Sequence, residues 1–111
     1  MFNFLKKDSV KNISPKEAKK RLESEDAIVL LDVREKAEYL EKHIPNSINK
    51  PLGKIGTVEK LVPDKESTVF TYCLRGGRAG NAASQMKKMG YKNVYNIGGI
   101  KDWPYETVSG K

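Results

Sequence analysis

One cysteine, followed closely by two arginines, carries most of the chemistry that this sequence offers. Cys73 is the single cysteine of the 111 residues, and it precedes the run Leu74-Arg75-Gly76-Gly77-Arg78. Two permanent positive charges beside a thiol favour the thiolate, the nucleophilic form of cysteine. Neighbouring glycines adopt backbone conformations that side chains forbid, so successive N–H groups can converge on one anion. The run predicts a nucleophilic sulfur in a cradle for a small anion, with a buried structural cysteine as the alternative.

The elements on either side of Cys73 are suited to position it. Thr68–Tyr72 is rich in β-branched and aromatic residues and predicts a central strand that ends at the cysteine. A helix is expected over Ala79–Met89, with Gly90 as its C-terminal stop. Its unpaired N-terminal N–H groups and the positive end of its dipole would face the sulfur.

Further strands and helices alternate along the chain. Ser14-Pro15-Lys16-Glu17 combines an N-cap serine, a proline at the first helical position and a glutamate three residues after the cap. Ala27–Val33 is a continuous apolar run that predicts a buried parallel strand. The remaining expected elements are an edge strand at 10–13, a helix at 35–42, a brief strand at Ile48, a poorer helix at 51–62, a strand at 94–97 and a short C-terminal helix with Ile100 and Trp103. This alternation predicts an α/β fold, a mainly parallel sheet flanked by helices on both faces. Such sheets bind ligands beyond the carboxyl ends of their strands, where Cys73 falls.

Net charge is unevenly distributed along the chain. The total is +7, but residues 1–21 carry +5, residues 22–72 carry −3 and residues 73–92 carry +5. No carboxylate side chain occurs between Glu66 and Asp102, and Cys73 lies in that interval. An anionic partner for this interval and a solvated basic helix face are the two interpretations.

Composition excludes several classes of protein. One cysteine permits no internal disulfide, and one cysteine with one histidine makes no metal site. The longest apolar run, 27–31, is far shorter than the roughly 20 residues that span a bilayer, so we expect no membrane partner. The N-terminal residues have neither the long apolar run nor the small-residue cleavage site of a signal peptide. The cytoplasm is therefore the expected location. We expect a single domain over residues 10–105, a frayed basic segment over 1–9 and a tail over 106–111.

Five motifs in order resemble the rhodanese-like family, which includes the thiosulfate sulfurtransferases. The resemblance covers about Ile13 to Trp103, and its motifs are Leu31–Glu35, His43–Pro45, Ile48–Leu52, Tyr72–Arg78 and Val94–Trp103. It implies a parallel sheet flanked by helices and a persulfide on Cys73. That persulfide would take sulfur from a small anionic donor such as thiosulfate and pass it to an external thiol, a protein acceptor or cyanide. No cofactor is implied.

The resemblance also suggests a role for each residue near the cysteine. The backbone N–H groups of Leu74 through Arg78 would stabilise the anionic sulfur. Arg75 would attract the donor at the pocket mouth, and Arg78 would brace the loop from behind, against Asp32. Arg34 is either a substrate-binding cation or a surface partner of a glutamate. His43 invites pairing with the cysteine, but the His-Ile-Pro element is usually a structural turn, and structural support is the prediction for His43.

Three other functions compete with sulfur transfer. The first is a cysteine phosphatase. The related Cdc25-type phosphatases have five residues between the cysteine and the arginine, which form a wider cradle for phosphate. Only four residues separate Cys73 from Arg78, and this shorter loop fits a persulfide sulfur better. A noncatalytic rhodanese-like module would carry sulfur or recruit partners without turnover. Nucleic-acid binding through the basic start lacks interleaved aromatic residues, so no nucleic-acid partner is expected. Oligomeric state is not predictable from these patterns.

Overall fold

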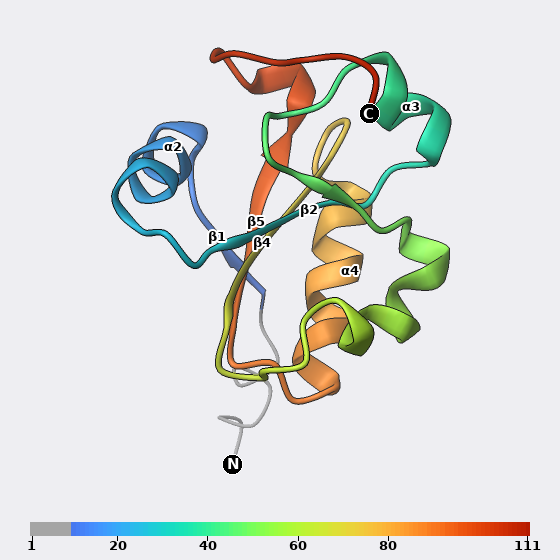
Figure 1. Cartoon of the computed structure of the whole chain (residues 1–111). Helices are drawn as coiled ribbons and strands as arrows, with labels where there is room; N and C mark the ends of the chain where they lie inside the picture. Colours follow the sequence, from blue (N-terminus) through green and yellow to red (C-terminus); the bar gives the residue numbers. More distant parts are fainter. Residues whose placement is uncertain (1–9) are drawn as a thin grey trace.

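A five-stranded parallel sheet places the cysteine strand at its centre (Figure 1). The computed structural model describes residues 10–111, so the basic segment predicted over 1–9 lies outside the described residues. The strands are β1 (Lys11–Asn12), β2 (Val29–Asp32), β3 (Ile48–Asn49), β4 (Thr68–Cys73) and β5 (Asn93–Gly99). Their spatial order is β1-β5-β4-β2-β3, and every pairing is parallel. The predicted α/β class is therefore confirmed.

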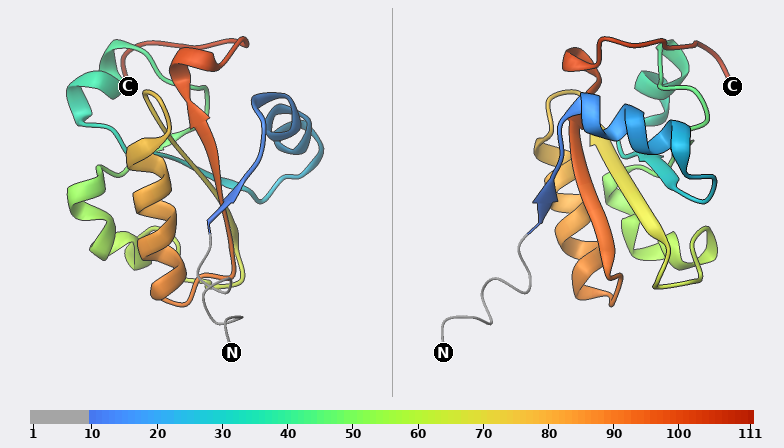
Figure 2. Two further views of the ribbon diagram at one scale, coloured as in Figure 1. Left: turned by 180° about the vertical axis from the view of Figure 1, so that it is seen from behind. Right: turned by 90° about the vertical axis from the view of Figure 1, so that its left-hand side faces the viewer.

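Helices cover both faces of the sheet, as expected (Figure 2). Helix α2 (Pro15–Ser24) lies on one face, and α4 (Gly77–Lys88) lies on the other. The remaining helical segments are α3 (Lys36–Glu41) and the 3₁₀ helices η1 (Leu52–Lys60) and η2 (Ile100–Asp102). The predicted cap of α2 is present, because the Glu17 N–H donates to Ser14 Oγ at 3.1 Å. Local sequence was sufficient there because a cap involves neighbours three residues apart.

Two helices differ from their predicted form. Helix α4 begins at Gly77 rather than at Ala79, so the cysteine loop is shorter than expected. The poorer helix expected over 51–62 is the 3₁₀ helix η1. Gly53 and Gly56 lie within it, and glycine weakens an α-helix through its backbone entropy.

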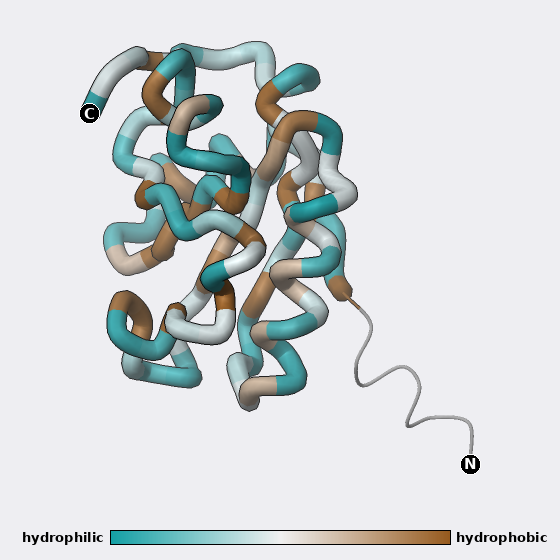
Figure 3. Tube along the Cα trace, turned by 90° about the vertical axis from the view of Figure 1, so that its right-hand side faces the viewer, coloured by the Kyte–Doolittle hydropathy of each residue, from teal (hydrophilic) through white to brown (hydrophobic). Residues whose placement is uncertain are grey.

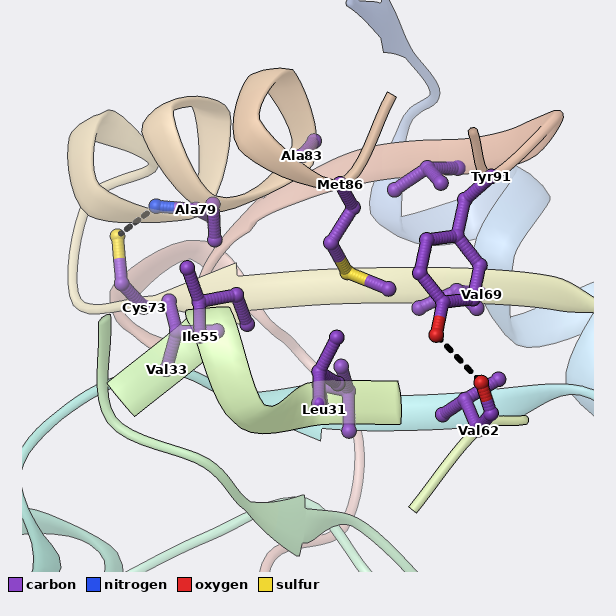
Figure 4. Packing of buried hydrophobic residues seen from close by; sticks show 13 residues of the cluster. Leu31, Val33, Ile55, Val62, Val69, Cys73, Ala79, Ala83, Met86 and Tyr91 are labelled. Atoms are coloured by element: carbon purple, nitrogen blue, oxygen red, sulfur yellow. Dashed lines mark hydrogen bonds between the residues drawn. The ribbon is translucent and has the colours of Figure 1, made fainter. Parts of the chain in front are cut away.

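Hydrophobic residues form two clusters, one on each face of the sheet. The first joins β2 and β4 to η1 and α4, with Leu31, Ile55 and Met86 among its fully buried members (Figure 4). The second includes Ala18 of α2, Phe70 of β4 and Trp103. Hydrophobic and hydrophilic residues alternate along the helical segments, and α2 and α4 contribute buried residues to these clusters (Figure 3). Both clusters hold β4 in place from opposite sides.

The last residues of the chain pass beside α3. His43 and Val108 form an antiparallel bridge in which each backbone N–H donates to the other's carbonyl at 2.8 Å. The Gly110 N–H donates to the Leu40 carbonyl at 2.7 Å. Residues 106–111, predicted as a tail, thus contact the C-terminal end of α3 (Figure 1).

Candidate active site

The sulfur of Cys73 lies at the carboxyl end of the central strand, beneath the start of α4. Cys73 is the last residue of β4 and is 2% exposed. Its Sγ accepts the Gly76 N–H at 3.0 Å and the Ala79 N–H at 3.4 Å. Figure 4 shows the second of these contacts, with Val33 and Ile55 beside the sulfur. Two backbone N–H donors are thus directed at one sulfur atom.

One glycine of the loop carries the sharp change of direction. Gly76 has φ +110° and ψ −16°, a left-handed conformation that disfavours a side chain. Gly77 has no positive φ, is the first residue of α4, and has open space where a Cβ would stand. The prediction that both glycines need unusual conformations therefore holds for Gly76 only.

The loop is fixed against the end of β5. Asn96 Nδ2 donates to the Gly76 carbonyl at 3.1 Å, while Asn96 Oδ1 accepts the Gly98 N–H at 2.8 Å. A Cβ on Gly99 would lie 1.9 Å from the Leu74 carbonyl oxygen, so only glycine fits under the loop. The end of β5 therefore holds the loop in position.

Arg78 braces the loop through a different partner from the one predicted. Its guanidinium donates to both carboxylate oxygens of Glu38 on α3, at 2.8 and 3.1 Å, and not to Asp32. Arg78 lies at the start of α4 facing α3, where Glu38 also accepts the Glu35 N–H at 3.0 Å. The hydrogen bond from Arg78 lowers the pKa of Glu38 from 4.5 to about 2.

Asp32 is occupied by Arg34, two residues along the chain. Arg34 Nη2 donates to Asp32 Oδ2 at 2.7 Å, and the Arg34 backbone N–H donates to Oδ1 at 2.9 Å. Asp32 is fully buried and Arg34 is 4% exposed, so the predicted surface pairing of Arg34 with a glutamate is wrong. Burial lowers the pKa of Arg34, but the hydrogen bonds to Asp32 and the attraction of the nearby negative groups together outweigh it, so the pKa of Arg34 is raised. The pair joins the end of β2 to the Lys42 carbonyl, which Arg34 Nη2 also reaches at 2.6 Å.

Two hollows are lined by residues of the loop. A hollow of about 550 Å³ is lined by Arg34 and the exposed Leu74, together with Lys101 and Trp103. A smaller one of about 290 Å³ is lined by Arg75, Gly76 and Asp102 among others. Arg75 is exposed and lines the smaller hollow. Arg34 lines the larger hollow, although its guanidinium is also committed to Asp32.

His43 is placed for packing and not for pairing with the cysteine. Its ring stacks on Tyr39 with ring centroids 3.7 Å apart, and Nδ1 lies 2.8 Å from the Tyr39 carbonyl oxygen. His43 is 3% exposed. Because a carbonyl oxygen can only accept, Nδ1 is the donor of this hydrogen bond. The imidazole thus holds the turn that follows α3.

Three residues that support the site were missed by sequence reasoning. Asn96 and Glu38 hold the loop, and Thr71 Oγ1 donates to the Ala79 carbonyl at 2.9 Å, which fixes the start of α4 on β4. Asn96 and Thr71 are polar residues within buried strands, and that is a usable signal, because buried polar groups need partners. Glu38 gave no such signal, since it is one of several glutamates on a solvated helix.

Residues 10–111 contain neither a metal-binding cluster nor a membrane-spanning helix. No group of three or more histidine, cysteine, aspartate or glutamate residues could hold a metal ion within this part of the chain. No helix of the same residues is long and apolar enough to cross a membrane.

Comparison with known proteins identifies the class that this fold and loop define. A family model described as "Rhodanese-like domain" matches residues 14–106. Thiosulfate sulfurtransferase PspE of Escherichia coli (strain K12) is 38% identical over 81 residues, covering 72% of this chain and 78% of PspE. A solved structure described as "rhodanese with anions from E. coli" has a TM-score of 0.71 at 38% identity, covering 76% of this chain and 100% of that one.

A further relative matches more of this chain but is itself longer. The "Putative sulfur carrier protein YrkF" of Bacillus subtilis (strain 168) is 36% identical over 102 residues, which cover 89% of this chain and 54% of YrkF. The chain thus spans about half the length of that relative. The protein belongs to the rhodanese-like domain family, and its homologues include proteins named as thiosulfate sulfurtransferases.

Proposed function

We propose that this protein is a sulfurtransferase that carries a sulfane sulfur as a persulfide on Cys73. The observation that carries the proposal is the pair of backbone donors, Gly76 N–H and Ala79 N–H, at 3.0 and 3.4 Å from Sγ. They hold a sulfur anion without a general base, and His43 packs on Tyr39 instead. The relatives named as thiosulfate sulfurtransferases support thiosulfate as the donor.

The first half of the cycle loads the cysteine. The Cys73 thiolate attacks the outer sulfur of thiosulfate, and the sulfur–sulfur bond within thiosulfate breaks. Sulfite leaves with the electron pair of that bond, and the outer sulfur remains on Cys73 with its negative charge. The N–H groups of Gly77 and Arg78 open α4 and have no carbonyl partner four residues back within the helix, so they can receive that charge. Arg75, exposed at the mouth, attracts the dianionic donor.

The second half of the cycle unloads the cysteine. A thiolate acceptor attacks the outer sulfur, the bond to Cys73 Sγ breaks, and Cys73 returns as the thiolate. Cys73 is the only cysteine, so no second thiol of the chain can take the sulfur through an internal disulfide. An external thiol, cyanide or a protein must therefore be the acceptor.

Intact mass spectrometry after incubation with thiosulfate tests the proposal. We expect the protein to gain the mass of one sulfur atom, and we expect the gain to disappear on treatment with cyanide or a thiol. The matched control is Cys73→Ser, which keeps the size of the side chain but not its nucleophilicity. If no sulfur is added to the natural protein, or if it is added equally to the variant, the proposal fails.

A noncatalytic sulfur carrier is the second candidate, and the relative named as a putative sulfur carrier favours it. A carrier and an enzyme both form the persulfide, so only turnover separates them. With thiosulfate and cyanide both in excess, an enzyme produces thiocyanate many times per protein molecule. A carrier produces one equivalent and then stops or continues very slowly. We expect repeated turnover, because the loop is already held in place by β5 through Asn96.

A further inference from the structure

A basic hollow beside α3 plays no part in the sulfur-transfer chemistry described above. Its volume is about 470 Å³, and Lys36, Lys50 and Lys54 line it, with Lys111 also at its edge. No aspartate or glutamate is among the residues that line it. We call this surface the basic hollow.

The three lysine charges are not compensated within the described chain. None of Lys36, Lys50 and Lys54 forms an ion pair with another of residues 10–111. Lys50 Nζ donates to the neutral Thr57 hydroxyl at 3.0 Å. Glu38, on the same helix as Lys36, is already paired with Arg78. The hollow therefore presents a concentrated positive potential.

Besides the lysines and Asn49, apolar side chains line the hollow. Leu40 is 36% exposed, and Pro51 and Tyr39 line the same surface. The Tyr39 ring has one face against His43, and its hydroxyl donates to the Ser47 carbonyl at 2.9 Å. An apolar lining suits an aliphatic side chain, whereas a tyrosine stacked on one face and tethered at its hydroxyl is a poor platform for a nucleic-acid base.

The hollow is built on the same edge of the sheet as Cys73. Lys50 directly follows β3, and its backbone N–H donates to the Asp32 carbonyl at the end of β2, at 2.9 Å. Strand β2 pairs with β4, which ends at the cysteine. Figure 1 shows α3 and the loop after β4 at the same end of the molecule. A partner bound in the hollow therefore lies at the same end of the sheet as the cysteine loop.

We propose that the basic hollow docks an acidic segment of a protein sulfur acceptor, in which carboxylates flank one aliphatic side chain. Its role as an acceptor site rests on the function proposed above. The carboxylates pair with Lys36, Lys50 and Lys54, and the aliphatic side chain lies against Leu40 and Pro51. The docked partner's thiolate attacks the outer sulfur of the Cys73 persulfide; that sulfur leaves on the partner, and Cys73 is released as the thiolate.

Binding is tested with a labelled peptide, EEDLEEDS, in fluorescence anisotropy. We expect the natural protein to bind it and Lys36→Glu/Lys54→Glu to bind about tenfold more weakly, because two favourable charges become repulsive. The matched control is Lys16→Glu/Lys20→Glu, which makes the same change of charge on exposed residues of α2. We expect replacement of the peptide's leucine by serine to weaken binding severalfold.

Three results would overturn the docking proposal. The first is that the natural protein does not bind the peptide. The second is that Lys16→Glu/Lys20→Glu weakens peptide binding as much as Lys36→Glu/Lys54→Glu does. The third is that a single-stranded oligouridylate of equal charge binds more tightly than the peptide and loses its binding in Lys36→Glu/Lys54→Glu. The last result would assign the hollow to nucleic acid.

Sulfur transfer gives a second readout that separates this inference from the function proposed above. The persulfide is formed with thiosulfate, and its sulfur is then passed to the peptide EEDLEEDC or to free cysteine. We expect the ratio of the two rates to fall about tenfold in the Lys36→Glu/Lys54→Glu variant and to stay unchanged in the α2 variant. A ratio that does not change removes the acceptor role. Failure to form the persulfide at all contradicts the proposed function and leaves the peptide-binding result to stand or fall separately.

Discussion

At the scale of single residues, the loop depends on where a side chain is forbidden. Gly76 is left-handed at φ +110°, and Gly99 lies so close to Leu74 that a Cβ would overlap its carbonyl oxygen. Gly77 is the first residue of α4, and a Cβ added to it would have no atom within 4 Å. Of these two adjacent glycines, Gly76 thus has a conformational reason to be glycine and Gly77 has none, and substitution by alanine distinguishes the two cases.

Gly76→Ala and Gly77→Ala form a matched pair for this prediction. We expect Gly76→Ala to lower the free energy of unfolding by about 1–2 kcal/mol, since an L-residue is strained in a left-handed conformation. We expect Gly77→Ala to leave it unchanged or to raise it by about 0.5 kcal/mol, because alanine suits a helix better than glycine. Urea denaturation of the two variants measures both effects. Equal effects of the two substitutions would contradict the assigned conformations.

At the scale of elements, α3 is held to α4 by one partly exposed ion pair. Arg78 and Glu38 are about one third exposed, and Glu38 also accepts the Glu35 N–H in a capping box at the start of α3. A single carboxylate thus caps one helix and ties down the residue that closes the cysteine loop. Its titration links the acidity of the solution to the packing of α3.

The stability of the protein should depend on pH through Glu38. Arg78 lowers the pKa of Glu38 from 4.5 to about 2 in the folded state. A lowered pKa means that the stabilisation is present above pH 4.5 and is lost as the pH falls from there toward 2. We expect the pair to contribute about 0.5–1 kcal/mol after allowance for its exposure to solvent.

Urea denaturation between pH 6 and pH 2.5, compared for Glu38→Gln and the natural protein, measures this contribution. We expect the variant to lose less stability across that interval. Glu41→Gln, on the same helix, is the charge-matched control. An identical pH dependence of all three proteins would show that the ion pair contributes nothing.

At the scale of the whole molecule, distant parts of the chain meet around α3. Val108 pairs with His43 through two backbone hydrogen bonds of 2.8 Å, and Gly110 donates to Leu40. His43 is buried, so its backbone groups would lose partners if the end of the chain were removed. The last residues are thus part of the folded unit.

Truncation after Tyr105 tests this contribution of the C-terminal residues. We expect the free energy of unfolding to fall by about 1–3 kcal/mol, because the buried N–H and C=O groups of His43 lose their partners. The control is removal of Lys111 alone, which leaves the bridge in place. Calorimetry or urea denaturation compares the two truncated proteins, and equal stabilities would refute the contribution of the bridge.

Local sequence patterns were sufficient to predict the strands and a helix cap, whereas the partners of the buried and half-buried arginines depend on tertiary contacts. The Ser14 cap, the buried strand that contains Leu31 and the strand that ends at Cys73 depend on near neighbours, so the sequence alone was sufficient. The partner of Arg78 is Glu38, forty positions away, and only the packing of α3 beside α4 brings them together. The burial of Arg34 could not be predicted from the sequence either, because it depends on the elements that enclose the end of β2.

The order of the strands also bears on synthesis. Strand β1 has β5 as its neighbour, with Lys11 opposite Tyr95 and Asn12 opposite Asn96. Among the strands of residues 10–111, β1 leaves the ribosome first during translation and must wait for β5, the last, before it can pair. Strands β2 and β4 are both made before β5, so the nascent chain can pair them in the middle of the sheet while Lys11 and Asn12 are still unpaired. The edge nearest the N-terminus closes only after the cysteine loop and α4 have been made.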